Sequence, residues 1–416
     1  MADFNQRNEV TAMDAVKHKR AVRLFVLVLV FTGIAGGFGN SIISNYFSEA
    51  FQIDSVQRGF IEIPRESPGV LCMLLVSALG FLGNLRMAIV AQVLLMIGLG
   101  VLGFCSPSYR VMLVFLFIQS MGMHFFMPLN DAISMELAEQ GKVGTGFGKF
   151  KGVTTLVSML SACVVFVGFR AGWFSFRTPV ILPFALGTVC TGAAVVLLVL
   201  LYRLMPEQGH GVRNHKLLFR RAYMPYYLVT LAYGCQKRIK LVFAPWVIIQ
   251  LLGQGADTVA LLTIVTHMAG TWVAPWIGRM LDKIGMKKML WLEAGYILLS
   301  FGIMGALAGM LSSGRFSVGG WQTWMVFVAY ILCVLFEQFN LVHSFMMRSI
   351  AVSPEEVTQT LSVGVSVDHV MAIVASPIMG LIWEAWGVQY VFYLAALSAL
   401  MQLAAAWVVK DPVPKG

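Results

Sequence analysis

Residues 222–252 read AYMPYYLVTLAYGCQKRIKLVFAPWVIIQLL, an apolar run with Lys237, Arg238 and Lys240 in its middle. The apolar residues on both sides of these cations supply the ~20 residues that a membrane-spanning helix needs. A cation at the centre of a bilayer costs about 2.5 to 3.5 kcal/mol, so the three side chains must meet partners or a water-filled cavity. The alternative is an amphipathic segment at the membrane surface, with the cations among the lipid headgroups. We expect a span that carries its cations into the protein interior.

The composition of the whole chain is typical of a helical membrane protein. Of the 416 residues, 58% are hydrophobic and 12% are charged, whereas a soluble domain has about 25% charged residues. The six cysteines are scattered, which predicts neither a disulfide framework nor a metal site. The sequence has no phosphate-binding loop or catalytic triad pattern. We therefore expect an all-α membrane protein that is not an enzyme, needs no cofactor and binds no nucleic acid.

Twelve runs are long enough to cross a bilayer as helices. They are residues 21–47, 57–82, 86–105, 109–133, 150–170, 178–203, 223–250, 257–280, 288–311, 320–345, 359–382 and 387–408. The longest connection divides the chain into six runs and six runs. The expected parts are a cytoplasmic tail over 1–20, a six-helix half over 21–203, a linker over 204–222, a second half over 223–408 and a tail over 409–416.

The basic residues predict the orientation of these spans. Most of the 30 Lys and Arg residues lie in connections on one side of the membrane. The connections on the other side hold Arg58, Arg110, Arg170, Arg177 and Arg315. Cytoplasmic loops are enriched in Lys and Arg, so we expect both termini in the cytoplasm and the protein in the plasma (inner) membrane.

Residues 278–288 read GRMLDKIGMKK, a G-x-x-x-D-K-x-G-x-K-K pattern between two expected spans. Glycine allows a tight turn, aspartate can cap a helix N-terminus, and basic residues suit the cytoplasmic side. The corresponding place in the first half, GFLGNLR over 80–86, has Asn84 where the second half has Asp282. Together with the twelve spans and their division into six and six, this loop resembles the signature loop of the major facilitator superfamily.

The resemblance covers residues 21–410 and implies a fold and a mechanism. It implies two pseudo-symmetric six-helix bundles, a substrate site near the membrane midplane between them, and alternating access. It also implies a conformational latch formed by Gly278, Asp282, Lys283 and Gly285 in the second half and by Asn84 and Arg86 in the first. The expected partners are a small-molecule substrate, protons as the coupling ion and the lipid bilayer, and the expected state is a monomer.

Charged residues inside the expected spans are the candidate site. Glu62, Arg65 and Glu66 are spaced i, i+3 and i+4, which places them on one face of a helix. Glu337 and Asp368 lie in the tenth and eleventh spans, where carboxylates serve as proton relays in transporters. Each acid could instead form a structural ion pair with one of the cations, and the sequence leaves both roles open.

We assign functions to these residues as follows. Substrate binding is assigned to Arg65, Lys237, Arg238 and Lys240, and proton coupling to Glu62, Glu66, Glu337 and Asp368, with His124 and His267 as further proton candidates. A lone histidine in a span can equally be a hydrogen-bonded packing residue. The cluster of cations on one span favours a small organic anion or zwitterion as substrate. The alternatives are an exporter of amphipathic drugs or cations, and a membrane sensor that does not transport.

Replacement of Asp282 by Asn should slow transport, because the amide keeps hydrogen-bonding capacity but loses the charge that a latch needs. Uptake rates in proteoliposomes and the populations of inward-open and outward-open states would measure this effect. A wild-type rate with unchanged populations would remove the latch assignment, and Asn84 in the first half already suggests that one charged latch suffices.

Overall fold

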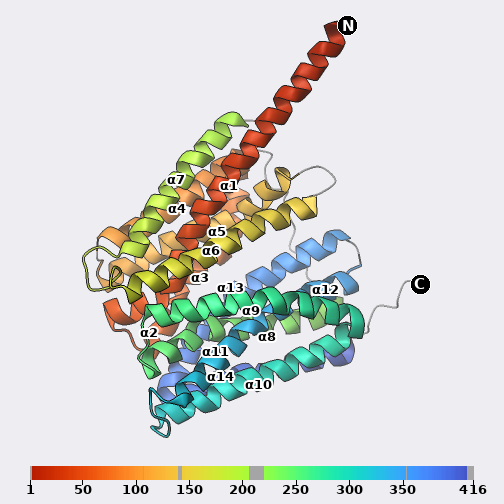
Figure 1. Ribbon diagram of the computed structural model, residues 1–416. Coiled ribbons are helices and arrows are strands. Elements are labelled where there is room, and N and C mark those ends of the chain that lie inside the picture. The colour runs from red at the N-terminus through yellow and green to blue at the C-terminus, as the bar shows by residue number, and fades with distance from the viewer. Residues whose placement is uncertain (1, 106, 139–142, 206–219, 353, 410–416) are drawn as a thin grey trace. The chain divides into compact units, whose positions relative to one another are not determined.

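A computed structural model describes residues 2–105, 107–138, 143–205, 220–352 and 354–409, and every regular element in those ranges is helical (Figure 1). The first half holds α1 (Ala2–Phe51), α2 (Ser55–Phe60), α3 (Glu62–Leu79), α4 (Asn84–Phe104), α5 (Tyr109–Glu136), α6 (Val143–Arg170) and α7 (Leu182–Leu204). The second half holds α8 (Met224–Trp246), α9 (Ala256–Ile284), α10 (Met286–Ser312), α11 (Trp321–Leu335), α12 (Asn340–Ile350), α13 (Pro354–Trp386) and α14 (Val388–Val408). The predicted all-α class is confirmed. Most of the predicted linker, residues 206–219, and residues 410–416 of the predicted tail lie outside the described ranges.

Ten helices among the described residues are long and apolar enough to cross a membrane, which makes the chain a multi-pass membrane protein. Two of the twelve expected spans, α3 and α8, are not among the ten. Each of these two helices carries three charged residues, and they are the residues assigned above to the candidate site. The two helices that are least suited to lipid are therefore those whose charges must be neutralised inside the protein.

The helices form two compact units. These units do not correspond to the two halves of the chain, because one segment of the first half belongs to the second unit. The first unit holds Met1–Ile42 and Pro68–Asn214, and the second holds Ile43–Ser67 and His215–Gly416. The end of α1, all of α2 and the start of α3 thus group with the second half. The charged residues of 58–66 consequently lie in the same unit as those of α8.

In the first unit, α4 packs against both α5 and α7. Glycine permits this close approach, because a Cβ atom on Gly122 would lie 2.3 Å from the Leu95 backbone nitrogen. Phe25, Met87 and Phe125 are buried in the core that these helices share with α1. The first unit therefore has a tightly packed core of its own.

In the second unit, α8 packs against α13 and α14, and α10 packs against α14. Gln236 of α8 exchanges hydrogen bonds with Gln402 of α14, with its Nε2 3.3 Å from the Gln402 oxygen and the reverse bond at 3.0 Å. After Trp246, α8 continues as a π-helical turn, Val247–Leu251. The expected tenth span is broken into α11, the 3₁₀ turn Phe336–Phe339 and α12, so Glu337 lies at a break between two helices.

The two predicted latch loops share a backbone feature. Gly83 precedes α4 with φ of 78°, and Gly285 lies between α9 and α10 with φ of 82°. Both angles are in the left-handed region that favours glycine. The suggestion that Asp282 could cap a helix N-terminus is wrong, because Asp282 lies in the last turn of α9.

The short helix α2 packs directly on α13. Its N-terminus is fixed by a capping box, in which the Asp54 side chain accepts from the Gln57 backbone N–H and the Gln57 side chain accepts from that of Asp54. A Cβ atom on Gly59 would lie 2.4 Å from the Ser376 carbonyl oxygen. A Cβ atom on Gly380 would lie 2.6 Å from the Ser55 carbonyl oxygen. Two glycines, one on each helix, therefore permit this contact.

Replacement of Gly59 by Ala should destabilise the second unit by about 1 to 3 kcal/mol, because the new methyl group meets backbone atoms that cannot move aside. Thermal unfolding of the purified protein in detergent would measure the loss. Gly302→Ala in α10 is the matched control, since nothing lies within 4 Å of a Cβ atom there. Equal unfolding temperatures for the two variants would contradict the proposed close contact.

Candidate functional site

The second unit has a cavity of about 370 Å³ that charged, polar and apolar residues line together. Its walls come from α8, the 3₁₀ turn, α12 and α13, and are formed by Tyr226, Thr230, Tyr233, Lys237, Glu337, Asn340, His343, Ser344, Gly364, Val365 and Asp368. Of the predicted substrate-binding residues, Lys237 lines the cavity. Of the predicted proton-coupling residues, Glu337 and Asp368 line it. Arg65, Arg238 and Lys240 are not part of its lining.

Asp368 joins two of the cations on α8. Its Oδ2 accepts from Lys237 Nζ at 2.7 Å and from an Arg238 guanidinium nitrogen at 3.2 Å. Successive residues on a helix point about 100° apart, so Lys237 can face the cavity with 24% of its side chain exposed while Arg238 is 4% exposed. The other oxygen of Asp368 is buried and has no hydrogen-bond partner among the described residues. Asp368 is therefore shared between an accessible and an inaccessible cation.

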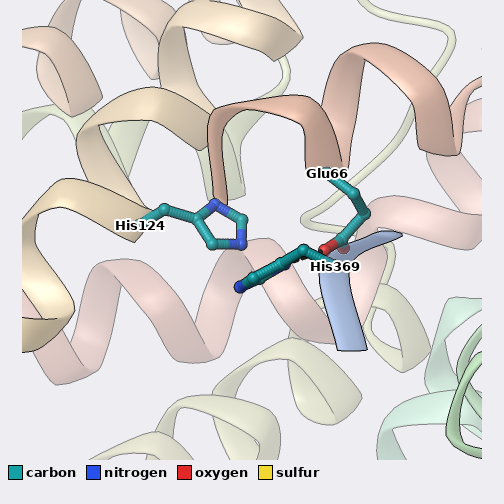
Figure 2. Close-up of side chains that lie close together, drawn as sticks. All are labelled: Glu66, His124 and His369. Atoms are coloured by element: carbon teal, nitrogen blue, oxygen red, sulfur yellow. Dashed lines mark hydrogen bonds and ion pairs between the residues drawn. The ribbon is translucent and has the colours of Figure 1, made fainter. Parts of the chain in front are cut away.

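Arg238 also pairs with Glu66 of α3. Its guanidinium donates to Glu66 Oε1 at 2.7 Å, and both side chains are 4% exposed. The other oxygen of Glu66 lies 3.0 Å from His369 Nδ1, and Figure 2 shows the Glu66 carboxylate turned toward the His369 ring. A continuous series of polar contacts therefore runs from Lys237 through Asp368 and Arg238 to Glu66 and His369.

Glu62 forms a second buried group with two arginines. Its Oε1 accepts from Arg58 at 2.7 Å and from Arg65 at 2.9 Å. The Arg58 side chain is completely buried, with its guanidinium 5.4 Å from the Phe47 ring centre and 5.9 Å from that of Trp246. Arg58 was expected in a connection between spans, but α2 brings it into the interior of the second unit. Its contact with aromatic faces adds a favourable interaction for the buried charge.

Lys240 pairs with Glu337 across the break between α11 and α12. The Nζ–Oε2 distance is 2.7 Å, and Lys240 is 4% exposed while Glu337 is 39% exposed. Glu337 therefore lines the cavity, while Lys240 lies behind it and does not contribute to the lining. The structural ion pairing that the sequence left open for Glu337 and Asp368 is present at both residues.

The two candidate histidines have hydrogen bonds to their own helices. Nδ1 of His124 lies 3.0 Å from the Ser120 hydroxyl and 2.9 Å from the Ser120 carbonyl oxygen. Nδ1 of His267 lies 2.7 Å from the Thr263 carbonyl oxygen. Such contacts are typical of packing histidines.

The residues assigned to the latch are not among those that line this cavity. Asp282 and Lys283 are exposed, and a Cβ atom on Gly278 would be in ordinary contact with Leu341, at 3.6 Å. Arg86 donates to the Tyr202 hydroxyl from Nε at 2.8 Å, and its guanidinium stacks 4.9 Å from the Tyr202 ring centre.

Sequence reasoning missed a buried pair beside the cavity, Glu293 of α10 and His343 of α12. His343 Nε2 lies 2.7 Å from Glu293 Oε1. Glu293 had the same signal as the other candidates, an acid inside the apolar run 288–311. Its relation to His343 requires the fold, because 50 residues separate the two in the chain.

The Lys240–Glu337 pair should show coupling in a double-mutant cycle. Lys240→Gln alone leaves a carboxylate without its cation, so adding Glu337→Gln should recover about 1 to 2 kcal/mol of the lost stability. Unfolding of the single and double variants in detergent measures this energy. The exposed Lys151–Asp131 pair, at 51% and 38% exposure, is the matched control and should couple by less than about 1 kcal/mol. Equal coupling at the two pairs would contradict the effect of burial.

Residues 68–304, more than half of the chain, match the family model described as Major Facilitator Superfamily. Comparison with curated proteins gives no match. The structure of the nucleoside transporter NupG is similar at 14% identity and a TM-score of 0.71, covering 94% of this chain and 99% of NupG. The peptide transporter POT in complex with sulfate is similar at 13% identity and a TM-score of 0.72, covering 94% of each chain. A POT family transporter in complex with 5-aminolevulinic acid has 13% identity and a TM-score of 0.70, with 92% and 95% covered. The TM-scores establish a common fold, and the match to the family model identifies the chain as a member of the major facilitator superfamily, whose proteins are transporters and not enzymes.

Proposed function

We propose that this protein is a proton-coupled secondary transporter of a small organic anion or zwitterion. In this proposal twelve spans form two pseudo-symmetric six-helix bundles, residues 21–203 and 223–408, which work by alternating access as a monomer. The chain resides in the plasma (inner) membrane with its tails, 1–20 and 409–416, and its linker, 204–222, in the cytoplasm. The observation that carries the proposal is the Lys237–Asp368 ion pair in the wall of the cavity.

The charge balance at this pair supports coupling between an anion and a proton. Lys237, Arg238 and Lys240 all have carboxylate partners. An anion that binds Lys237 must therefore compete with Asp368, and two negative charges would then share the same cations. Like charges in a low-dielectric site repel strongly. A proton on Asp368 removes that repulsion, so anion and proton bind more favourably together than either does alone.

The rest of the wall suits a polar solute. Hydroxyl groups of Thr230 and Ser344, the Asn340 amide and two tyrosines offer hydrogen bonds to groups that are not charged. Glu337 faces the cavity with a carboxylate that could receive the ammonium end of a zwitterion. Lys237 at one part of the wall and Glu337 at another thus provide opposite charges for the two ends of such a molecule.

The ion-pair series suggests how binding could be passed to the transport cycle. Arg238 forms ion pairs with both Asp368 and Glu66. If Asp368 loses its charge, the attraction between Glu66 and Arg238 becomes the stronger of the two interactions. We propose Asp368 and Glu66 as the leading coupling residues, with Glu62, Glu337, His124 and His267 as further candidates. Arg65, Arg238 and Lys240 would then support the substrate site through their partners.

The latch is proposed at Gly278, Asp282, Lys283 and Gly285, with Asn84 and Arg86 in the first half.

One observation favours a second function, export of amphipathic cations. Two carboxylates, Glu337 and Asp368, line the cavity together with one cation, Lys237. If Lys237 remained bound to Asp368, Glu337 would be the accessible charge and would attract a cation. The two functions predict opposite preferences for the charge of the substrate.

A test begins with thermal unfolding in the presence of carboxylates, ammonium compounds and zwitterions of matched size. Uptake of each stabilising compound into proteoliposomes would then be measured with and without an imposed pH gradient. Lys237→Gln should weaken binding of an anion or zwitterion about 10- to 100-fold, which corresponds to the loss of a hydrogen bond to a charged group. Asp368→Asn should retain counterflow exchange, which needs no net proton movement, but lose accumulation driven by the gradient.

The control for these variants is Lys151→Gln, which removes an exposed cation of the first unit. Stabilisation by ammonium compounds alone would favour the cation exporter. Unaltered anion affinity in a folded Lys237→Gln variant would remove Lys237 from the substrate site. Gradient-driven accumulation at the wild-type level in Asp368→Asn would assign the proton to another group.

A further inference from the structure

The buried pair formed by Glu293 and His343 differs from the other ion pairs of the second unit. Glu293 is completely buried in α10, and His343 of α12 is 4% exposed. Imidazole Nε2 and carboxylate Oε1 lie 2.7 Å apart. The second oxygen, Glu293 Oε2, is buried and has no hydrogen-bond partner among the residues that the structure describes. A carboxylate in this position has unsatisfied capacity to bind a proton.

The partner of this acid makes it distinctive. Glu62, Glu66, Glu337 and Asp368 all pair with Lys or Arg side chains, which remain charged across the physiological pH range. Within the described part of the chain, Glu293 has no Lys or Arg within ion-pair distance, and its partner is an imidazole. Histidine gains and loses its proton between about pH 5 and pH 8. One proton therefore decides whether the pair is an ion pair or carries a net negative charge.

His343 connects the pair with the cavity. Its side chain is part of the cavity wall, whereas Glu293 is not, so a proton can reach Glu293 from the cavity through the imidazole ring. The Tyr233 ring packs edge-on against the imidazole, with 5.0 Å between ring centres. Lys237 of α8, Glu337 of the 3₁₀ turn and Asp368 of α13 share the cavity wall with His343. Tyr233 of α8 also interacts electrostatically with Glu293, Arg238, Glu337 and Asp368. On the α11 side of α10, the Cys333 thiol donates to the Ser300 carbonyl oxygen.

The pair sets the charge of the surrounding ion-pair set. We define the inner charge set as Arg58, Arg65, Lys237, Arg238, Lys240, Glu62, Glu66, Glu293, Glu337 and Asp368. Five cations balance five carboxylates, so the set is neutral when His343 and the His369 that contacts Glu66 are both neutral. A proton bound between His343 and Glu293 gives the set a charge of plus one.

We propose that His343 and Glu293 form a proton-binding site whose occupation adds one positive charge to the cavity wall. The site is distinct from Asp368, because no lysine or arginine has to be released before the proton binds. Occupation favours an anionic group in the cavity, and release of the proton removes the added charge. The inference goes beyond the proposed function, since proton binding here requires neither a substrate nor transport.

Proton binding can be measured on the full-length protein without a substrate. Infrared difference spectra between pH 5 and pH 8 would be recorded in lipid nanodiscs, with ring-labelled histidine to identify the imidazole bands. The wild-type spectrum should contain an imidazole change and a glutamate carboxyl change with the same pH dependence. His343→Asn should lose both changes, since the asparagine amide cannot hold the proton. Glu293→Gln should lose the carboxyl change.

His18→Asn is the matched control, because His18 is an exposed histidine of α1. Its spectrum should lose an imidazole contribution and keep the carboxyl change. A carboxyl change that persists in His343→Asn, or one that persists in Glu293→Gln, would overturn the proposal. Size-exclusion profiles and unfolding temperatures would establish that the variants are folded. If His343→Asn does not fold, the Glu293→Gln spectrum alone decides the outcome.

Discussion

The second unit depends on the burial of Arg238 between Glu66 and Asp368. A guanidinium that is 4% exposed must recover its lost hydration from charged hydrogen bonds, and the two acids supply them at 2.7 Å and 3.2 Å. These acids come from α3 and α13, so the charge on α8 requires three helices to meet at one place. The ion pairs thereby help to hold residues 43–67 with the helices of the second half.

The two ends of this ion-pair series are in different surroundings. Lys237 is in contact with the cavity, whereas Glu66 belongs to the segment that follows α2 and its close contact with α13 at Gly59. Arg238 and Asp368 lie between these ends and share their bonds with both. A change of charge in the cavity therefore alters electrostatic interactions at the α2–α3 segment without any movement of the intervening backbone. This arrangement gives the proposed coupling a physical route through ion pairs with separations of 2.7 to 3.2 Å.

The sequence was sufficient to predict that the buried cations pair with carboxylates, but not which carboxylate pairs with which cation. Three cations in the apolar run 222–252 required carboxylates, and the spans offered Glu62, Glu66, Glu337 and Asp368. The pairing of Lys240 with Glu337 depends on a 3₁₀ turn that breaks the tenth run, and no helical periodicity predicts that break. The burial of Arg58 depends on α2 packing against α13, a contact that spans more than 300 residues of chain. The Glu293–His343 pair was missed for the same reason, because its partners belong to different helices.

Stability alone is a poor reason for so many buried charges. A buried ion pair costs several kcal/mol of desolvation per ion, and apolar residues of similar volume often replace such pairs without loss. Ion pairs have a property that apolar contacts lack, because a proton or a bound ion can change their strength by altering a charge. A protein that must favour two conformations in turn needs contacts whose free energy differs between ligand states. Lys237, Glu337, Asp368 and His343 line the cavity, so their charges are those that the cavity contents can reach. The buried members, Arg238 and Glu66, are those that connect such changes to the packing of helices.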